Sequence, residues 1–113
     1  MKAQKIIMLI AFVFMGVQTS AQEPILSKES FKVWGNCEMC KTTIEKASLA
    51  VDGVKSARWN VATKKIKVNF NPKRTSIGEI KKAIANSGYD TVEFKAREED
   101  YNNLHSCCKY DRK

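Results

Sequence analysis

The chain contains, at residues 34–40, the sequence Trp34-Gly35-Asn36-Cys37-Glu38-Met39-Cys40, and the other elements can be placed outward from it. This stretch puts two thiols three residues apart, after a short apolar run and before a helical pattern. If Cys40 lies in the first turn of a helix, both sulfurs project beside free amide N–H groups. Such groups favour negative charge and lower the pKa of a thiol. A pair of thiolates is a soft ligand set that suits Cu(I), Zn(II) or another thiophilic ion.

The same Cys-x-x-Cys spacing also fits a redox dithiol, half of a zinc site or a structural disulfide. A thioredoxin-like dithiol usually has a proline opposite it, but Pro24 and Pro72 fall in a polar lead and in a surface loop. A disulfide between Cys37 and Cys40 would close a very small ring and add little stability. We therefore take metal binding by these two cysteines as the main hypothesis, with a thiol-disulfide exchange protein as the alternative.

The regions on both sides of this stretch show alternating and helical hydrophobic patterns that predict six elements. In chain order these are a strand at 30–34, a helix at 38–51, strands at 54–61 and 65–70, a helix between Ser76 and Ser87, and a strand at 89–95. Asp52-Gly53 ends the first helix, and Ser76 with Glu79 fits a capping box for the second. This order predicts an α+β fold, the ferredoxin-like βαββαβ sandwich. Its four-stranded antiparallel sheet carries two helices on one face.

The amino-terminal residues have the pattern of a targeting segment. Lys2 and Lys5 precede an apolar run at 6–17, and small residues follow it up to Ala21. The run is shorter than the roughly 20 residues that span a bilayer. We predict a secretory signal peptide at 1–21 and therefore a periplasmic or secreted mature protein. The polar residues that come next, 22–29, are expected to form a flexible lead.

Composition limits the kind of partner and reaction. The net charge of +8 favours solubility and attraction to acidic surfaces. The lysines are scattered over several elements without an aromatic platform, which argues against nucleic acid as a partner. The chain has one histidine, no paired carboxylates near a nucleophile and no phosphate loop, so we expect no enzymatic activity. A single domain at 30–95 is expected, and a monomer.

A tail at 96–113 follows the last expected strand and carries further soft ligands. Tyr101, Leu104, His105 and Cys108 lie at helical spacing, so either a short helix or a frayed charged terminus is expected. Such a helix would bring His105, Cys107 and Cys108 near the first loop as candidate accessory ligands. Three or four ligands would shift the metal preference toward tetrahedral Zn(II) or clustered Cu(I). The alternative is an adjacent thiol pair on a mobile end.

With its elements in this order, the chain resembles the heavy-metal-associated domain family over about residues 31–95. The resemblance rests on Cys37-x-x-Cys40, Ile44-Glu45-Lys46-Ala47, Asp52-Gly53-Val54, Lys64-Lys65-Ile66-Lys67-Val68, and Ile80-Lys81-Lys82-Ala83-Ile84 leading to Gly88-Tyr89. The family includes small copper chaperones, amino-terminal modules of metal-pumping ATPases and periplasmic mercury-binding proteins.

The resemblance implies that Cys37 and Cys40 bind one soft metal ion at an exposed loop and pass it on by ligand exchange. Cu(I) is the favoured ion, with Hg(II) or Zn(II) as alternatives. The implied partner is a metal-transporting membrane protein or another metal-binding protein. Tyr89 falls at a family position that often packs near the metal loop. The chain departs from the family in two places. Trp34-Gly35-Asn36 stands where a Gly-Met-x sequence is usual, so the methionine of that sequence is missing, and the minimal domain lacks the cysteine-containing tail.

Overall fold

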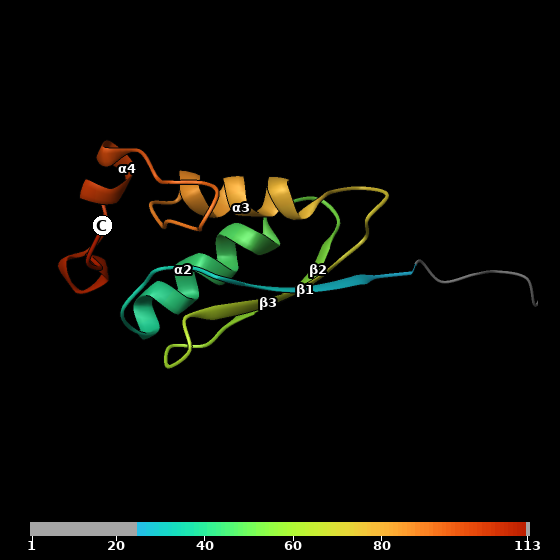
Figure 1. Cartoon of the computed structure of the whole chain (residues 1–113), viewed down its shortest axis with the longest axis horizontal. Helices are drawn as coiled ribbons and strands as arrows, with labels where there is room; N and C mark the ends of the chain where they lie inside the picture. The colour runs from blue at the N-terminus through green and yellow to red at the C-terminus, as the bar shows by residue number, and fades with distance from the viewer. Residues whose placement is uncertain (1–24, 113) are drawn as a thin grey trace, which may run out of the picture.

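The computed structural model describes residues 25–112 (Figure 1). The expected signal peptide at 1–21 and the first residues of the expected lead lie outside the described residues. The elements in order are β1 (Ser27–Lys32), α2 (Glu38–Leu49), β2 (Val54–Trp59), β3 (Lys65–Phe70), α3 (Ile77–Asn86), α4 (Glu98–Asn102) and the 3-10 helix η2 (Ser106–Cys108). None of the helices in the described part of the chain is long and apolar enough to cross a membrane.

The strands form an antiparallel sheet in the order β1-β3-β2. Ile66 in the central strand pairs with Phe31 on one side and with Trp59 on the other. Buried and exposed side chains alternate along β3, as the sequence predicted. The β2–β3 hairpin turns at Asn60, whose side-chain oxygen accepts hydrogen bonds from the amides of Ala62 and Thr63. Two of the expected strands are thus confirmed.

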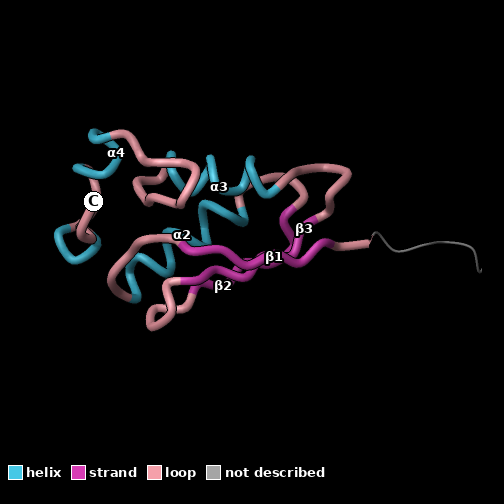
Figure 2. The backbone as a smooth tube through the Cα atoms, viewed as in Figure 1, coloured by secondary structure: helices cyan, strands magenta, loops and turns pink. Residues whose placement is uncertain are grey.

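Helices α2 and α3 cover one face of this sheet, as the tube in Figure 2 shows. Both helices turn an apolar side toward the sheet, and Ser76 caps α3 by accepting a hydrogen bond from the amide of Glu79. The core between the layers contains Val33, Cys40, Ile44, Ala57, Trp59, Ile66, Val68, Phe70, Ile80, Ile84, Tyr89, Cys108 and Tyr110. Two residues of the tail therefore belong to the same core as the sheet and the helices.

The prediction of a fourth strand at 89–95 was wrong, because the sheet of the described residues has three strands. One ladder-like hydrogen bond remains, from the Trp34 amide to the Asp90 carbonyl at 3.0 Å. Beyond it the chain turns back on itself, since the Thr91 amide donates to the Phe94 carbonyl at 2.8 Å. The Asp90 carboxylate then accepts the Ala96 amide at 2.7 Å. These local bonds replace the ladder that a strand would have made with β1.

The first strand also differs from its prediction, because β1 runs over Ser27–Lys32 where 30–34 was expected. Residues 27–29 of the expected lead therefore pair with β3, where Ser27 lies opposite Phe70. Their polar side chains are explained by exposure, since this end of β1 buries little of its surface. The apolar alternation on which the prediction rested is confined to Phe31 and Val33.

The tail folds as two short helical segments, α4 and η2, and η2 contacts α2. In Figure 1 the tail lies beyond the end of α3 and returns toward the start of α2. The Tyr101 hydroxyl donates to the Tyr110 carbonyl at 2.6 Å, and the two rings meet edge to face. Of the two expectations for this region, the ordered one describes the structure, and it brings the adjacent cysteine pair to the Cys-x-x-Cys loop.

Candidate metal centre

The start of α2 places the two cysteines of the Cys-x-x-Cys motif side by side. Cys37 is the N-cap residue, with an extended backbone (φ −141°), and its carbonyl accepts the Lys41 amide. Cys40 follows in the first turn and is fully buried, whereas Cys37 is partly exposed. Their sulfurs are 3.6 Å apart. The motif thus has one sulfur at the surface and one directly beneath it.

The loop before Cys37 lies close against the core. Gly35 passes over Trp59 and Ile44, and a Cβ at this position would come within 3.1 Å of the indole ring. The indole N–H of Trp59 donates to the Val33 carbonyl at 3.1 Å. The amide of Asn36 points at the Cys40 sulfur, 3.4 Å away. A glycine lying over a tryptophan therefore positions the loop that precedes the first cysteine.

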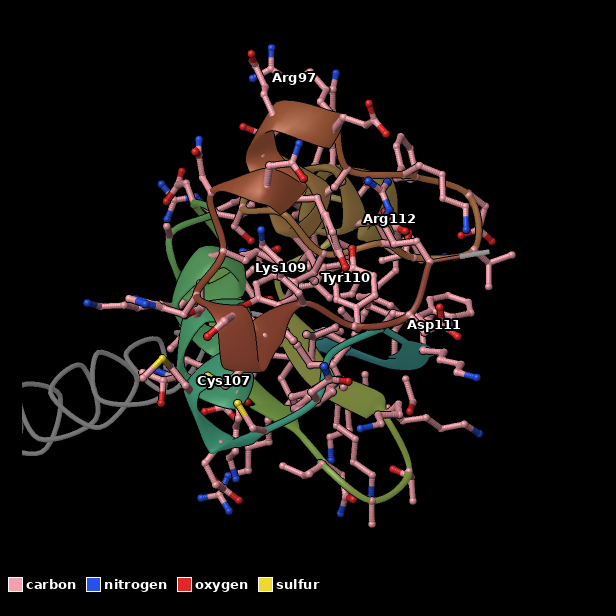
Figure 3. All side chains as sticks on the ribbon, turned by 90° about the vertical axis from the view of Figure 1, so that its left-hand side faces the viewer. Arg97, Cys107, Lys109, Tyr110, Asp111 and Arg112 are labelled. Atoms are coloured by element: carbon pink, nitrogen blue, oxygen red, sulfur yellow. The ribbon has the colours of Figure 1, made fainter. Side chains whose placement is uncertain are left out.

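The tail brings two further sulfurs to the loop. The Cys107 sulfur lies 3.5 Å from that of Cys37, and the Cys108 sulfur lies 3.8 Å from it. The sulfurs of Cys37, Cys40 and Cys108 all lie within 4.8 Å of one another. Cys108 is buried and Cys107 is exposed. Figure 3, in which Cys107 is labelled, views the molecule from the tail side, where η2 lies next to the start of α2.

Met39 and His105 take different positions relative to these sulfurs. The Met39 thioether lies 3.8 Å from the Cys107 sulfur, and its side chain is 48% exposed. His105 is exposed and precedes η2, and its imidazole is not among the groups that lie within 4.8 Å of one another. The structure thus brings the tail cysteines to the loop without the histidine.

The thiols of Cys37, Cys107 and Cys108 differ in how readily they lose a proton. The amide of Cys40, which faces the Cys37 sulfur, and the thiol of Cys107 lower the pKa of Cys37 to about 7. The contact with Cys37 raises the pKa of Cys107. Burial also raises the pKa of Cys108, and burial followed by the Cys108 contact raises the pKa of Tyr89. Of these three thiols, Cys37 is therefore the one that most readily acts as a thiolate.

Tyr110, Arg112 and Asp90 position the tail, and the sequence did not indicate that they belong to the site. Tyr110 donates its hydroxyl to the Gly88 carbonyl at 2.8 Å and accepts the Asp90 amide at 2.9 Å. Arg112 donates twice to the Asp90 carboxylate, at 3.0 Å in each case. The Tyr110 ring also stacks against Tyr89, which itself contacts Cys108. The one sequence signal for this arrangement is a tyrosine two positions after the adjacent cysteines.

These donors are chemically uniform. They are four thiols and one thioether, and such ligands prefer soft ions over hard oxygen-seeking ones. The Cys37 sulfur, whose pKa is lowered to about 7, is also partly exposed, so that an ion or an incoming thiolate can reach it. The arrangement can hold a thiophilic cation at the surface and exchange it without opening the core.

Comparisons with known proteins agree with this chemistry. The pattern of the heavy-metal-associated domain matches residues 36–90. Copper chaperone CopZ of Staphylococcus aureus (strain bovine RF122 / ET3-1) is 34% identical over 68 residues, which are 59% of this chain and 100% of the chaperone.

Two solved structures extend the comparison. The first is the Cu(I)-loaded N-terminal domain of a potential copper-translocating P-type ATPase from Bacillus subtilis. It shares 32% identity with a TM-score of 0.57, over 59% of this chain and 85% of that domain. Oxidized MerP from Ralstonia metallidurans CH34 shares 29% identity with a TM-score of 0.57, over 59% and 94% of the two chains. With its motif, element order and full-length match to a small chaperone, the chain belongs to the heavy-metal-associated domain family.

Proposed function

We propose that this protein is an exported carrier of a soft metal ion, in which Cys37 and Cys40 bind the ion and transfer it to a partner. Cu(I) is the favoured cargo, because the relatives with the higher identities are a copper chaperone and a Cu(I)-loaded ATPase domain. Hg(II) and Zn(II) are the alternatives, the first supported by the likeness to MerP. The chain acts as a binding protein and not as an enzyme.

The observation that carries the proposal is the pairing of a surface sulfur with a buried one, 3.6 Å apart, at the start of α2. The buried sulfur of Cys40 keeps its position because core residues surround it. The partly exposed sulfur of Cys37, with its pKa lowered to about 7, can bind first and release last. Because thiolates are the ligating form, uptake should release protons and weaken in acid.

The proposed partner is a metal-transporting membrane protein or another protein with an exposed dithiol. Support comes from likeness to the N-terminal domain of a potential copper-translocating P-type ATPase. Transfer would follow ligand exchange, in which a partner thiolate adds to the ion at Cys37 before Cys40 leaves. Export rests on the sequence pattern of residues 1–21. It is tested by fractionating cells that express the full chain and measuring the mass of the protein, which should begin at Gln22.

The decisive experiment is a competitive titration of the reduced protein with Cu(I) against a chromophoric chelator. Wild type should take the ion from the chelator, and the double variant Cys37→Ser/Cys40→Ser should not. Thr42→Ala is a matched control, because Thr42 is an exposed residue of the same helix. Equal uptake by wild type and the double variant would eliminate the proposal. A further titration with Hg(II) and Zn(II) ranks the three ions.

Thiol-disulfide exchange is the second candidate, because Cys37 combines a pKa of about 7 with three other sulfurs within 3.8 Å. A low pKa beside a resolving thiol is the common property of redox dithiols. Turnover in an insulin-reduction or disulfide-isomerisation assay, abolished by Cys37→Ser, would favour this function over metal transfer. No turnover together with tight Cu(I) binding would reject it.

A further inference from the structure

We propose that the adjacent cysteines of the tail are metal ligands, so that Cys37, Cys40 and Cys108 bind one soft ion and Cys107 supplies a fourth, outer thiolate. This inference rests on the proposed function, and it changes the nature of the site. A two-thiolate site suits an ion with two ligands. A site of three or four thiolates suits an ion that accepts a trigonal or tetrahedral sulfur environment, such as Zn(II), Cd(II) or three-coordinate Cu(I).

The spacing of the sulfurs supports a shared ion. Cys37 lies 3.6 Å from Cys40, 3.5 Å from Cys107 and 3.8 Å from Cys108. A tetrahedron with metal–sulfur bonds of about 2.3 Å has edges of about 3.8 Å, so neighbouring ligands of one ion lie at this distance. The spacing is also too long for a disulfide, whose sulfurs are about 2.05 Å apart. The sulfurs of Cys37, Cys40 and Cys108 therefore lie at the separation that ligands of a common ion require, and Cys107 adjoins this trio through its contact with Cys37.

The position of Cys108 is more specific than burial alone would require. A buried cysteine often serves only as a small apolar residue. Cys108, however, is 1% exposed, yet its sulfur faces the two sulfurs of the loop within 4.8 Å. Tyr89, which is buried, contacts the same sulfur. Cys108 thus completes an inner trio with its sulfur oriented toward the other two.

The tail reaches this position through bonds that do not involve sulfur. Tyr110 is linked through its hydroxyl to Gly88 and Asp90, and Arg112 makes a two-point ion pair with the Asp90 carboxylate. Arg112 also donates to the Ala96 carbonyl at 2.7 Å. These contacts flank the cysteine pair on its carboxyl-terminal side. They hold Cys107 and Cys108 in place before an ion arrives, which lowers the entropic cost of binding it.

The exposure of the sulfurs orders their roles in exchange. Cys40 and Cys108 are buried, Cys37 is partly exposed, and Cys107 is exposed at the outside of the group. An incoming thiolate from a partner can reach the ion only from the side of Cys107 and Cys37. Cys107 is therefore the ligand that a partner displaces first, with its sulfur taking up a proton as the partner's thiolate binds. The tail then acts as a cap that retains the ion until a thiol-bearing partner arrives.

The test uses Cd(II) and Cu(I) as probes of the reduced chain. The ultraviolet charge-transfer band of Cd(II) grows with the number of bound thiolates. Wild type should show the band of three or four thiolates, and Cys107→Ser/Cys108→Ser the band of two. The double variant should also lose affinity for Cd(II) by more than the roughly tenfold cost of removing one supporting partner of a ligand. Lys109→Gln is the matched control, because Lys109 is an exposed residue of the same tail.

The outcomes separate this inference from the proposed function. Unchanged band intensity and affinity in Cys107→Ser/Cys108→Ser would overturn the tail ligands and leave the Cys37/Cys40 carrier intact. If Cys37→Ser/Cys40→Ser loses all Cd(II) binding and Cys107→Ser/Cys108→Ser shows a reduced band, the results support both the proposed function and the tail ligands. Equal binding by every variant would overturn both.

Cys108→Ser could weaken the core, so a second variant keeps every sulfur. Tyr110→Phe removes the hydroxyl that holds the tail, and it should weaken Cd(II) binding while the fold, checked by circular dichroism, is retained. If Tyr110→Phe binds Cd(II) as wild type does, and neither Cys107→Ser nor Cys108→Ser alone reduces the band, the tail does not contribute ligands.

Discussion

The hydroxyl of Tyr110 donates a hydrogen bond to the carbonyl oxygen of Gly88 over 2.8 Å, joining the tail to the end of α3. The hydroxyl oxygen of Tyr110 also accepts a hydrogen bond from the amide of Asp90, a group that a fourth strand would have used for pairing. The Tyr110 hydroxyl of the tail thus makes hydrogen bonds with two backbone groups, the Gly88 carbonyl and the Asp90 amide, that the sheet leaves unpaired. Burial raises the pKa of Tyr110, so its hydroxyl keeps the proton that it donates. The tail is therefore part of the domain.

Tyr110→Phe should lower the free energy of unfolding by about 1–3 kcal/mol, the cost of leaving buried polar groups without a partner. The Gly88 carbonyl and the Asp90 amide both lose their partner in this variant. Urea denaturation of the reduced apo protein measures the change. Lys109→Gln, one position away and exposed, should unfold at the wild-type urea concentration. An unaltered midpoint for Tyr110→Phe would mean that the tail docks without this bond.

Gly88→Ala should displace the tail, because Gly88 has a φ of +106° and faces α4 closely. An added Cβ would lie 2.8 Å from the Asp100 carbonyl oxygen and 2.8 Å from a methyl carbon of Leu104. Backbone strain of this kind costs on the order of 1–3 kcal/mol. Thermal unfolding and limited proteolysis of the tail report the effect.

Gly78→Ala is the matched control for Gly88→Ala. Gly78 lies in α3, and the nearest atom to an added Cβ is the Ser76 oxygen at 3.8 Å. This replacement should raise stability by roughly 0.5–1 kcal/mol, since alanine favours a helix. Equal effects of the two replacements would contradict a close contact between Gly88 and the tail.

Cys37 should be the first thiol to react with iodoacetamide in the reduced apo protein. Its pKa is lowered from 9.0 to about 7, so the thiolate dominates above neutral pH and is lost as the pH falls through that value. The rate of alkylation should therefore rise between about pH 6 and about pH 8 and then level off. Peptide mass mapping identifies the modified residue.

Cys107 serves as the internal comparison for that rate profile, because it is exposed but has a raised pKa. It should become reactive only at a higher pH than Cys37. If Cys107 were modified first at neutral pH, exposure and not thiolate character would govern reactivity at this site.

Trp59→Phe should loosen the metal loop as well as the core. The indole N–H donates to the carbonyls of Val33 and Lys64, and the ring lies directly beneath Gly35. Loss of these bonds and of ring volume should cost about 2–4 kcal/mol in unfolding free energy. Cu(I) affinity should fall too, because the loop no longer holds Cys37 at a fixed distance from Cys40. Phe70→Leu, at the other end of the sheet, should lower stability without altering the affinity of the folded fraction.

The sequence was sufficient for the elements whose pattern is local. Alternation along Ile66, Val68 and Phe70 predicted β3, and the Ser76 cap predicted the start of α3. The Cys37–Cys40 pair could be placed at a helix start because its spacing and the following helical pattern are adjacent in the chain. Local patterns carry such information because each element buries one side of itself.

What could not be predicted depends on contacts between distant residues. Val92 was expected in a strand, but it is 66% exposed. After the Trp34–Asp90 hydrogen bond the chain turns back, because the Asp90 carboxylate binds the Ala96 amide and Arg112 of the tail. Residues 27–29 are too polar to be recognised as a strand, although they pair with β3. The meeting of Cys37 with Cys107 spans 70 positions, and no periodicity reports on such a contact. The tail was therefore the region where sequence patterns left two alternatives open.

The spacing between Cys108 and Tyr110 gives a way to find proteins built in the same manner. A phenol two positions after a pair of adjacent cysteines can reach backbone groups next to a Gly-Tyr-Asp turn, as it does here at Gly88 and Asp90. Genomes can be searched for this fingerprint beside a Cys-x-x-Cys helix. Chains that carry it would be expected to fold their ends onto the thiols, whereas chains with terminal cysteines but no tyrosine would leave them free.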